Sequence, residues 1–226
     1  MSSRRPCIAI DGPVAAGKST IARLVADRLG FTYIDSGAMY RALAWAARAR
    51  GITAAEADAA TALLDQVAIR LEPQAGGRNR VFVDQREVTE EIRAQELGQL
   101  ASQLSEIPTV RERMVALQQE MGRAGGVVME GRDIQTVVLP QAEVKVFLVA
   151  SAEERARRRT LELRERGQEA DFASVLAEIR SRDERDSNRA HSPLRPAPGA
   201  ARLDTTGLTI EEVVARVLAL ARPHLG

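Results

Sequence analysis

One octapeptide near the N-terminus constrains the fold more than any other feature of the sequence. Residues 12–19 read GPVAAGKS, which fits the pattern G-x-x-x-x-G-K-[ST]. A short apolar run, 7–10, precedes the octapeptide, and apolar residues at helical spacing follow it as far as Gly30. A strand, a glycine-rich loop and a helix in this order surround phosphate oxygens with backbone N–H groups at a helix N-terminus. The sequence therefore predicts a nucleoside triphosphate site.

Within this loop we expect Lys18 to bridge the β- and γ-phosphates and the Ser19 hydroxyl to ligate Mg²⁺. The position of the lysine is informative, because only Lys18 and Lys145 are lysine among 32 basic residues. The residues predicted to bind ATP in the loop are Gly12, Pro13, Val14, Ala15, Ala16, Gly17, Lys18, Ser19 and Thr20.

The pattern along the rest of the chain predicts an α/β fold with a central parallel sheet and helices on both faces. Further strands are expected at 31–34, 127–129, 144–149 and 201–203. Helical periodicity is expected at 18–30, 35–51, 94–123 with a break at Pro108, 152–189 and 209–221. In the middle, 67–71 and 80–83 alternate like strands around a Gly76-Gly77 turn, and Val88 extends the pattern. We interpret this middle segment as a small antiparallel insert.

Composition excludes several other classes. The 32 basic and 31 acidic residues leave a net charge of +1, so the chain has no global field for nucleic acid or an anionic membrane. Aromatic residues make up 3%, which leaves few stacking platforms for RNA. One cysteine and two separated histidines offer no metal-ligand spacing. No signal peptide and no apolar run of about 18 residues is recognised, so a cytoplasmic location without a membrane partner is expected.

The loop motif occurs in several classes of protein. A switch GTPase needs a guanine-reading N-K-x-D tetrapeptide, which the sequence lacks. A motor or repair ATPase stays open, because the run Val127–Glu130 ends in an acid that can hold a metal. Small-molecule kinases are the favoured class.

Charged residues at three further places predict an acceptor site. Asp35–Arg41 begins a helix after the second strand, and Gly131–Asp133 directly follows a buried strand, at the sheet edge where α/β proteins bind ligands. Arg182, Asp186 and Arg189 lie on one helical face. The segment from 153 to 189 holds ten arginines and ten acidic residues, which suits exposed helices rather than a polybasic arm. Its run 155–159 is expected to form a mobile lid over ATP that excludes water.

These motifs together resemble the bacterial cytidylate kinases, a P-loop nucleoside monophosphate kinase family. The resemblance rests on 12–19, Asp35–Arg41, the stretches 101–103 and 110–112, 131–134, and 182–189, which span almost the whole chain in the same order. It implies transfer of the γ-phosphoryl group of ATP, with Mg²⁺, to CMP or dCMP. It also implies a single domain, 1–226, with a monophosphate-binding insert at about 36–105 and a lid at about 155–170. A kinase for another acceptor, such as UMP, AMP or a small metabolite, is the alternative.

The resemblance implies a role for each matching residue. Ser102, Arg111 and Asp133 contact cytosine, Arg41, Arg132 and Arg189 hold the acceptor phosphate, and Arg182 and Asp186 hold the pentose. The catalytic residues it implies are Lys18, Arg132, Arg182 and Arg189. Ser36, Gly37 and Tyr40 complete the acceptor site, and Arg158 joins the ATP site from the lid. We expect small-molecule partners only, with no nucleic acid, and a monomer.

Three positions depart from the usual pattern of that family. Ala15 and Gln135 stand where glycine is usual, and Glu130 stands where aspartate is common. Alanine at position 15 restricts the loop backbone, because glycine alone reaches positive φ values freely. These departures bear on the level of activity more than on its type.

Overall fold

The computed structural model describes residues 4–74, 79–165, 167–189 and 191–225. The strands are β1 (Cys7–Asp11), β2 (Thr32–Asp35), β3 (Ile69–Glu72), β4 (Arg80–Val83), β5 (Arg86–Glu87), β6 (Val127–Gly131), β7 (Val144–Val149) and β8 (Ala201–Asp204). The α-helices are α1 (Lys18–Leu29), α2 (Ser36–Ala49), α3 (Ala57–Gln66), α4 (Gln95–Leu104), α5 (Pro108–Gly122), α6 (Ala152–Glu165), α7 (Phe172–Asn188) and α8 (Ile210–Ala221). Shorter helical turns are η1 (Glu91–Arg93), η2 (Ile134–Val138) and η3 (Arg222–His224).

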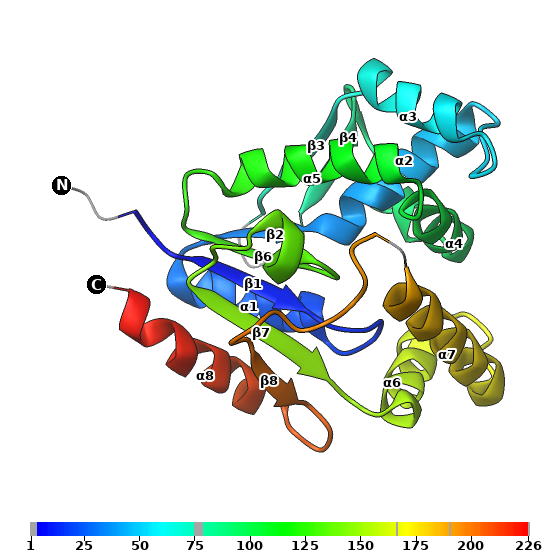
Figure 1. Ribbon diagram of the computed structural model, residues 1–226. Coiled ribbons are helices and arrows are strands. Elements are labelled where there is room, and N and C mark those ends of the chain that lie inside the picture. The colour runs from blue at the N-terminus through cyan, green and yellow to red at the C-terminus, as the bar shows by residue number, and fades with distance from the viewer. Residues whose placement is uncertain (1–3, 75–78, 166, 190, 226) are drawn as a thin grey trace.

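The main sheet is parallel and, among the described residues, has the strand order β2-β6-β1-β7-β8. The residues of β1 and β6 are buried throughout, which explains why their sequences are continuous apolar runs rather than alternating ones. All the carboxyl ends of these strands meet at one edge, on the right in Figure 1, while both chain ends lie on the left. The predicted parallel α/β class is confirmed.

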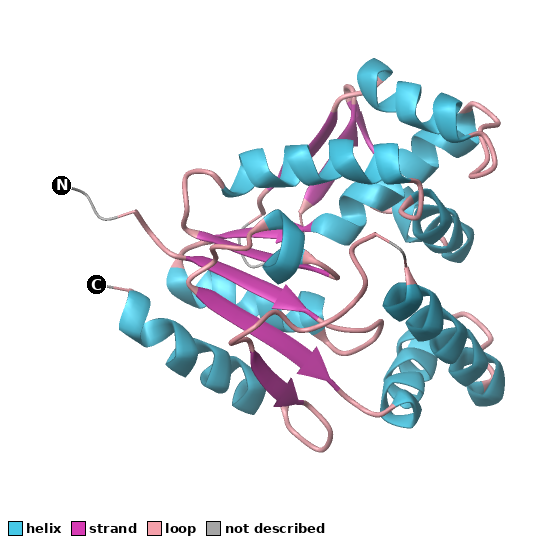
Figure 2. Ribbon diagram, in the orientation of Figure 1, coloured by secondary structure: helices cyan, strands magenta, loops and turns pink. Residues whose placement is uncertain are grey.

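Two layers of helices cover the sheet (Figure 2). On one face α1 and α8 share an apolar cluster with β1 and β7 that includes Ile8, Val25 and Val214. On the other face α5 and the single π-helical turn η2 pack over Ala9 and Met129. No helix among the described residues is long and apolar enough to cross a bilayer.

Local sequence signals account for most helix ends. Gly30 ends α1 with φ of 59° and donates to the carbonyls of Ala26 and Asp27, as expected for a C-terminal glycine. Pro108 is at the start of α5, where its missing N–H costs nothing. Thr209 begins α8 with a capping box, in which the Thr209 hydroxyl accepts the backbone N–H of Glu212 and the backbone N–H of Thr209 donates to the Glu212 carboxylate.

The middle of the chain differs in detail from the prediction. A small antiparallel sheet forms, with order β3-β4-β5, but its third strand is Arg86–Glu87 and Val88 lies beyond it in the apolar core. The predicted Gly76-Gly77 turn lies outside the described residues. Helix α3 was not predicted, because Ala60 and Leu63 are its only buried residues and give too weak a pattern.

Two bodies flank the carboxyl edge of the sheet. The platform comprises residues 36–122, which contain α2 to α5 and the small sheet, and its helix α5 also extends over one face of the main sheet. The helix pair comprises α6 and α7. The platform lies at the upper right of Figure 1 and the helix pair at the lower right. The helical periodicity predicted over 152–189 corresponds to two helices, α6 and α7, which pack against each other.

Candidate active site

The phosphate loop is shaped by two glycines and one strained alanine. A Cβ at Gly12 would collide with the carbonyl oxygen of Leu148, so only glycine lets the loop pass beside β7. Gly17 has φ of 90° and precedes α1. Ala15 also lies in the left-handed region, with φ of 59°, which disfavours every residue except glycine. Its methyl group is therefore accommodated at an energetic cost.

Lys18 is buried at the start of α1, and its Nζ donates to the carbonyl oxygen of Pro13 at 2.7 Å. Burial, together with the positive charges of Arg132 and Arg182, lowers the pKa of Lys18 to about 7. The charge of Glu130 opposes this shift. The ammonium group is therefore held inside the loop among other cations, a position that an anion would stabilise.

Glu130 ends β6 beside the phosphate loop. Burial raises the pKa of its carboxyl and the charge of Asp35 raises it further, while Lys18 and hydrogen bonds from Ser19 and Tyr33 oppose the rise. The Tyr33 hydroxyl lies 3.0 Å from a carboxylate oxygen of Glu130. Ser19 and Glu130 together present hydroxyl and carboxylate oxygens, the donor type that Mg²⁺ prefers, so the residues present fit that ion.

The loop after β6 is fixed by a carboxylate from the neighbouring strand. Both oxygens of Asp11 accept backbone N–H groups, from Ile134 at 3.0 Å and from Gln135 at 2.9 Å. Burial raises the pKa of Asp11 to about 7, and these two hydrogen bonds oppose the rise. Asp11 directly precedes Gly12, so one residue joins the phosphate loop to the loop that carries Arg132 and Asp133.

Arg132 connects that loop to the helix pair. Its Nε donates to Asp186 in α7 at 2.8 Å. Arg189 lies 3.9 Å from the same carboxylate and donates to the Ser105 hydroxyl at 3.4 Å. Burial and the charge of Arg132 lower the pKa of Arg182 to about 10. Several arginines thus crowd around one carboxylate, which leaves an excess of positive charge for an anionic ligand.

A second arginine and carboxylate pair lies deeper, between α5 and the loop after β6. Arg111 donates to Asp133 at 2.6 Å, and both side chains are buried. Its other terminal nitrogen donates to the Ser105 carbonyl at 3.0 Å, and its guanidinium lies 6.0 Å from the ring centre of Tyr40. The Ser102 carbonyl accepts the Ser105 hydroxyl at 2.7 Å. These residues form a buried polar wall that can pair with a planar base edge.

The start of α2 completes this side of the site. Asp35 caps α2 by accepting the N–H of Ala38, and Ser36 donates to the Glu130 carbonyl at 2.6 Å. Arg41 follows one turn later and donates to the Ile92 carbonyl at 3.3 Å. Gly98 in α4 leaves room for its guanidinium, because a Cβ there would lie 3.3 Å from a terminal nitrogen. Gly37 stands between the cap and this arginine.

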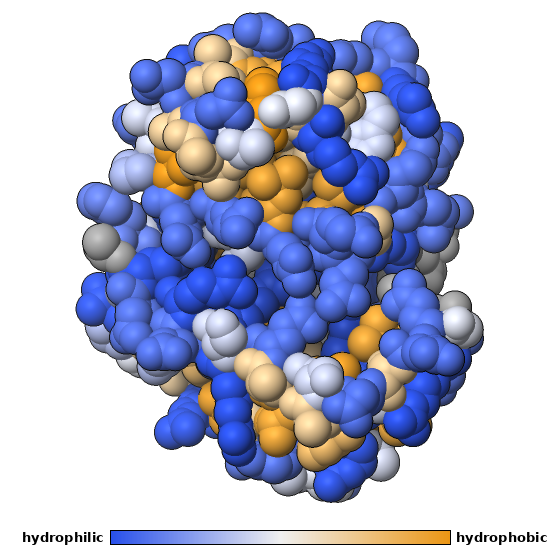
Figure 3. Space-filling model, turned by 90° about the vertical axis from the view of Figure 1, so that its right-hand side faces the viewer, coloured by the Kyte–Doolittle hydropathy of each residue, from blue (hydrophilic) through white to orange (hydrophobic). Residues whose placement is uncertain are grey.

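The structure thus links most of the predicted acceptor residues by contacts, and Arg158 has other partners. Arg158 donates to Glu154 and to Thr205, both to its hydroxyl and to its carbonyl oxygen at 2.7 Å. Thr205 lies in the loop after β8, so the predicted ATP contact of Arg158 stays a prediction. Figure 3 shows that hydrophilic residues occupy the space between the platform above and the helix pair below.

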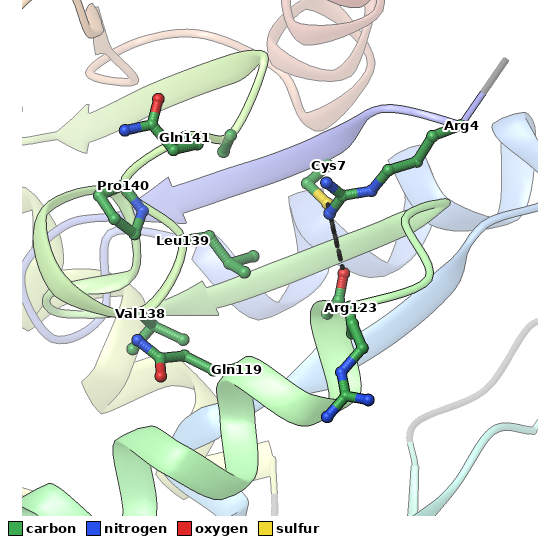
Figure 4. Close-up of a pocket in the computed structure, with 10 residues that line it drawn as sticks. Arg4, Cys7, Gln119, Arg123, Val138, Leu139, Pro140 and Gln141 are labelled. Carbon is green, nitrogen blue, oxygen red and sulfur yellow. Dashed lines mark hydrogen bonds between the residues drawn. The ribbon is translucent and has the colours of Figure 1, made fainter.

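A cavity of about 170 Å³ lies at the opposite edge of the sheet, near the N-terminal end of β1 (Figure 4). Arg4 and Cys7 line it, and Arg4 donates to the Gly122 carbonyl at 3.4 Å. None of the predicted site residues lines this cavity.

Sequence reasoning missed the roles of Asp11, Ser105 and Asp183, and it placed Arg155 in the lid without its contacts to the phosphate loop and to α7. Arg155 and Asp183 stand among many other charges, which hides their pairing in the sequence. Asp11 could have been noticed as an acid placed directly before the phosphate loop at the end of an apolar strand.

A phosphate-binding loop facing a cluster of arginines across the carboxyl edge of a parallel sheet defines the class of P-loop kinases. The family model described as Cytidylate kinase matches residues 8–223. A protein of that name from Geobacillus thermodenitrificans is 50% identical over 223 residues, which cover 99% of each chain. Another from Symbiobacterium thermophilum is 49% identical and covers 96% of each. The chain therefore belongs to the cytidylate kinase family, and it is a nucleoside monophosphate kinase.

A solved structure supports the fold alone. An uncharacterized protein from Eubacterium ventriosum superposes with a TM-score of 0.53 at 9% identity, over 97% of this chain and 99% of its own. At that identity the likeness concerns the arrangement of strands and helices, and function rests on the family and the site.

Proposed function

We propose that the protein transfers the γ-phosphoryl group of Mg-ATP to CMP and dCMP, forming CDP or dCDP and ADP. The observation that supports this most directly is the continuous set of contacts from Arg132 through Asp186 and Arg189 to Ser105 and Arg111. Such a set offers charge for an acceptor phosphate at one end and a polar wall for a base at the other.

The proposed chemistry needs no side-chain base. An acceptor phosphate is largely dianionic near neutral pH, since its second pKa is about 6. Its oxygen attacks the γ-phosphorus, the bond to the bridging oxygen breaks, and ADP carries away the electron pair. Arginine suits the acceptor side because its planar fork binds two phosphate oxygens and stays charged. Catalysis then comes from alignment and charge neutralisation by Lys18, Arg132, Arg182 and Arg189.

Mg²⁺ would supply charge neutralisation between the donor phosphates when bound. Ser19 would ligate the ion, and Glu130, whose carboxylate accepts a hydrogen bond from Ser19, would supply a further oxygen donor. The ten ATP-binding positions and the eleven acceptor-binding positions named from the sequence remain parts of this proposal.

The proposal also assigns roles to two segments. Residues 36–105 would bind the monophosphate, because Arg41 and Ser102 reach the site from them. Residues 155–170 would act as the lid that excludes water while ATP is bound. The monomeric state and the cytoplasmic location stay predictions.

Base choice is expected to come from Ser102, Arg111 and Asp133. A base that lacks a partner for this wall would leave a buried polar group unsatisfied, at about 1–3 kcal/mol for each group. The same argument predicts that UMP and AMP are poorer acceptors than CMP.

The direct test is an assay of ADP release with Mg-ATP and each of CMP, dCMP, UMP, AMP, GMP and shikimate. We expect strong turnover only with CMP and dCMP. Turnover confined to another acceptor would overturn the cytosine assignment while leaving the phosphate loop intact.

Two variants and one control separate the two halves of the site. Lys18→Ala is expected to abolish turnover with every acceptor, whereas Asp133→Ala should mainly reduce the preference for CMP over UMP. Asp65→Ala is the matched control, since Asp65 forms an exposed ion pair with Arg113 at 3.1 Å. Full phosphoryl transfer by the Lys18 variant would show that the loop assignment is wrong.

A further inference from the structure

Arg155, in the first turn of α6, uses its whole guanidinium group to join three separate segments. Its Nε donates to the Ala150 carbonyl at 3.0 Å, just beyond the end of β7. One terminal nitrogen donates to the carbonyl of Val14 in the phosphate loop at 3.2 Å. The two terminal nitrogens also bind Asp183 in α7, at 3.0 and 2.6 Å. The fork therefore fixes α7 relative to the phosphate loop and the sheet.

The position of Asp183 in α7 gives this contact its importance. Asp183 directly follows Arg182 and lies three residues before Asp186, the residue that accepts a hydrogen bond from Arg132. A shift of α7 that breaks the Asp183 contact therefore also moves the residues proposed to hold the pentose. Because α7 is one continuous helix, a displacement at Asp183 also displaces Arg182 and Asp186.

A second observation joins the same segments independently. Val14 and Ala15 of the phosphate loop pack against the small apolar cluster inside the helix pair, which contains Ala156 and Ile179. The loop therefore touches the helix pair through apolar contacts as well as through Arg155. If the loop backbone moves when phosphate binds, these contacts would transmit the displacement to both helices.

Geometry distinguishes this ion pair from the others between α6 and α7. The side chain of Arg155 is 5% exposed and that of Asp183 is 26% exposed. Another pair between these helices, Arg180 with Glu153 at 2.7 Å, has side chains that are 62% and 52% exposed. Buried charges with two parallel hydrogen bonds hold a fixed geometry, whereas exposed pairs contribute little.

We propose that Arg155 and Asp183 are positioning residues that couple binding of donor phosphates in the loop to placement of α7 for the acceptor. Donor binding favours the loop position in which the Val14 carbonyl receives Arg155, and Arg155 holds Asp183 and α7 in place. Because coupling between two binding sites is reciprocal, acceptor binding strengthens donor binding by the same factor. This proposal rests on the proposed function, since it takes CMP as the acceptor.

The experiment measures the dissociation constant of CMP by calorimetry, without and with a saturating non-hydrolysable ATP analogue and Mg²⁺. For the unaltered protein we expect the analogue to tighten CMP binding at least fivefold, at the low end of typical coupling between sites. In Asp183→Asn the factor should fall below twofold, while the analogue alone binds within about twofold of normal. The control Glu153→Gln removes the exposed pair and should keep the full factor.

A further variant guards against a simple folding defect. Asp183→Asn leaves a buried guanidinium without its full partner, so the double variant with Arg155→Gln removes both charges and should regain its unfolding midpoint. The double variant should nevertheless lose the coupling as completely as the single one. Recovery of coupling together with the unfolding midpoint would overturn the proposal.

Other outcomes also decide the matter. Equal losses in Asp183→Asn and Glu153→Gln would show that any disturbance between α6 and α7 has the same effect, and the proposal would be wrong. Absence of coupling in the unaltered protein would be equally decisive against it. Failure of CMP to bind at all, while another monophosphate binds, is a failure of the proposed function, and the coupling is then measured with that monophosphate.

Discussion

The platform and the helix pair face the same site, but different interactions hold them together. The platform has one large apolar cluster, in which Leu43, Leu97 and Met114 have no exposed area. The helix pair, among the described residues, shares a cluster of four buried apolar residues, Ala156, Leu163, Val175 and Ile179, and relies on ion pairs for the rest. Burial of apolar area dominates stability, so we expect the platform to be rigid and the helix pair to open locally.

This difference suits the two tasks of a kinase. A base is selected by polar groups whose positions do not change, and Arg111 and Asp133 are fixed between α5 and the sheet. ATP must enter and leave while water is excluded during transfer, which needs a part that moves. Under the proposed function, the platform, which has the larger apolar cluster, would select the base, and the helix pair, which has the smaller one, would close over the nucleotide.

The largest expected effect is on global stability after truncation of one leucine in each body. Leu43→Ala creates a cavity in the large cluster and should lower the free energy of unfolding by about 3–5 kcal/mol. Leu163→Ala, in the small cluster, should lower it by about 2 kcal/mol, the low end for this change, because Leu163 is 7% exposed and has few buried apolar neighbours. Denaturant titrations of both variants check this. Equal losses would remove the distinction between the two bodies.

The next effect concerns local opening without any substitution. We expect backbone amides of α6 and α7 to exchange with deuterium about 100-fold faster than those of α2, a difference of about 2.7 kcal/mol in opening free energy. Adding CMP with the ATP analogue should slow exchange in α6 and α7 and leave α2 unchanged. Hydrogen exchange read by mass spectrometry of peptides measures both. Equal protection in the free protein would contradict the proposed division.

The same division explains what could be predicted from the sequence. The phosphate loop, the parallel strands and the capped helices are encoded by residues close together in the chain, such as 12–19 and Thr209 with Glu212. Helix α3 was not predicted, because its two buried residues give no clear helical period. The turn η2 was not predicted, because its first two N–H groups donate to Asp11, which lies more than 120 residues away in the sequence. Local patterns do not carry such distant pairings.

The residues of the candidate site were also predicted only where the signal was local in the sequence. Arg132, Asp133 and Asp186 were identified because each follows a strand or shares a helical face with another charged residue, and the resemblance supplied their roles. The partners of Arg155 could not be chosen from ten arginines and ten acids that alternate along one segment. The contact of Arg158 with Thr205, 47 residues away, could not be predicted for the same reason, and its predicted ATP contact stays a prediction.

A smaller effect should appear in the protonation of Lys18. Its pKa is about 7 in the free protein and about 10.5 ordinarily, so within that range the unfolded chain holds a proton that the folded one lacks. Below pH 7 both states hold the proton, and burial of the charged Lys18 then lowers the free energy of unfolding by its full amount. As the pH rises from 7 toward 10.5, the folded chain loses this proton before the unfolded chain does, so the free energy of unfolding rises. Bound phosphate restores the proton, so binding of the ATP analogue at pH 8.5 should take up to about one proton, and less at pH 6.

Calorimetry in two buffers with different ionisation enthalpies measures this uptake. Arg182 of the helix pair is one of the charges that lower the pKa of Lys18, so the uptake also reports where α7 lies in the free protein. Arg182→Gln should reduce the uptake at pH 8.5, because Lys18 would then be more often protonated before binding. An uptake that does not change in this variant would indicate that α7 lies away from the loop until nucleotide binds.

The smallest effect is expected at Ala15, where the phosphate loop packs against the helix pair. Its φ of 59° costs an L-residue about 1–2 kcal/mol, which Ala15→Gly would remove. Glycine also gives the unfolded chain more freedom, which costs about 0.4–1 kcal/mol, and the variant loses a methyl group that packs against the helix pair. These terms nearly cancel, so the free energy of unfolding should change by less than about 1 kcal/mol. Hydrogen exchange in α6 and α7 should nevertheless quicken, because the loop loses one of its two apolar contacts with them. A slower exchange would show that the strained alanine loosens the helix pair rather than anchoring it.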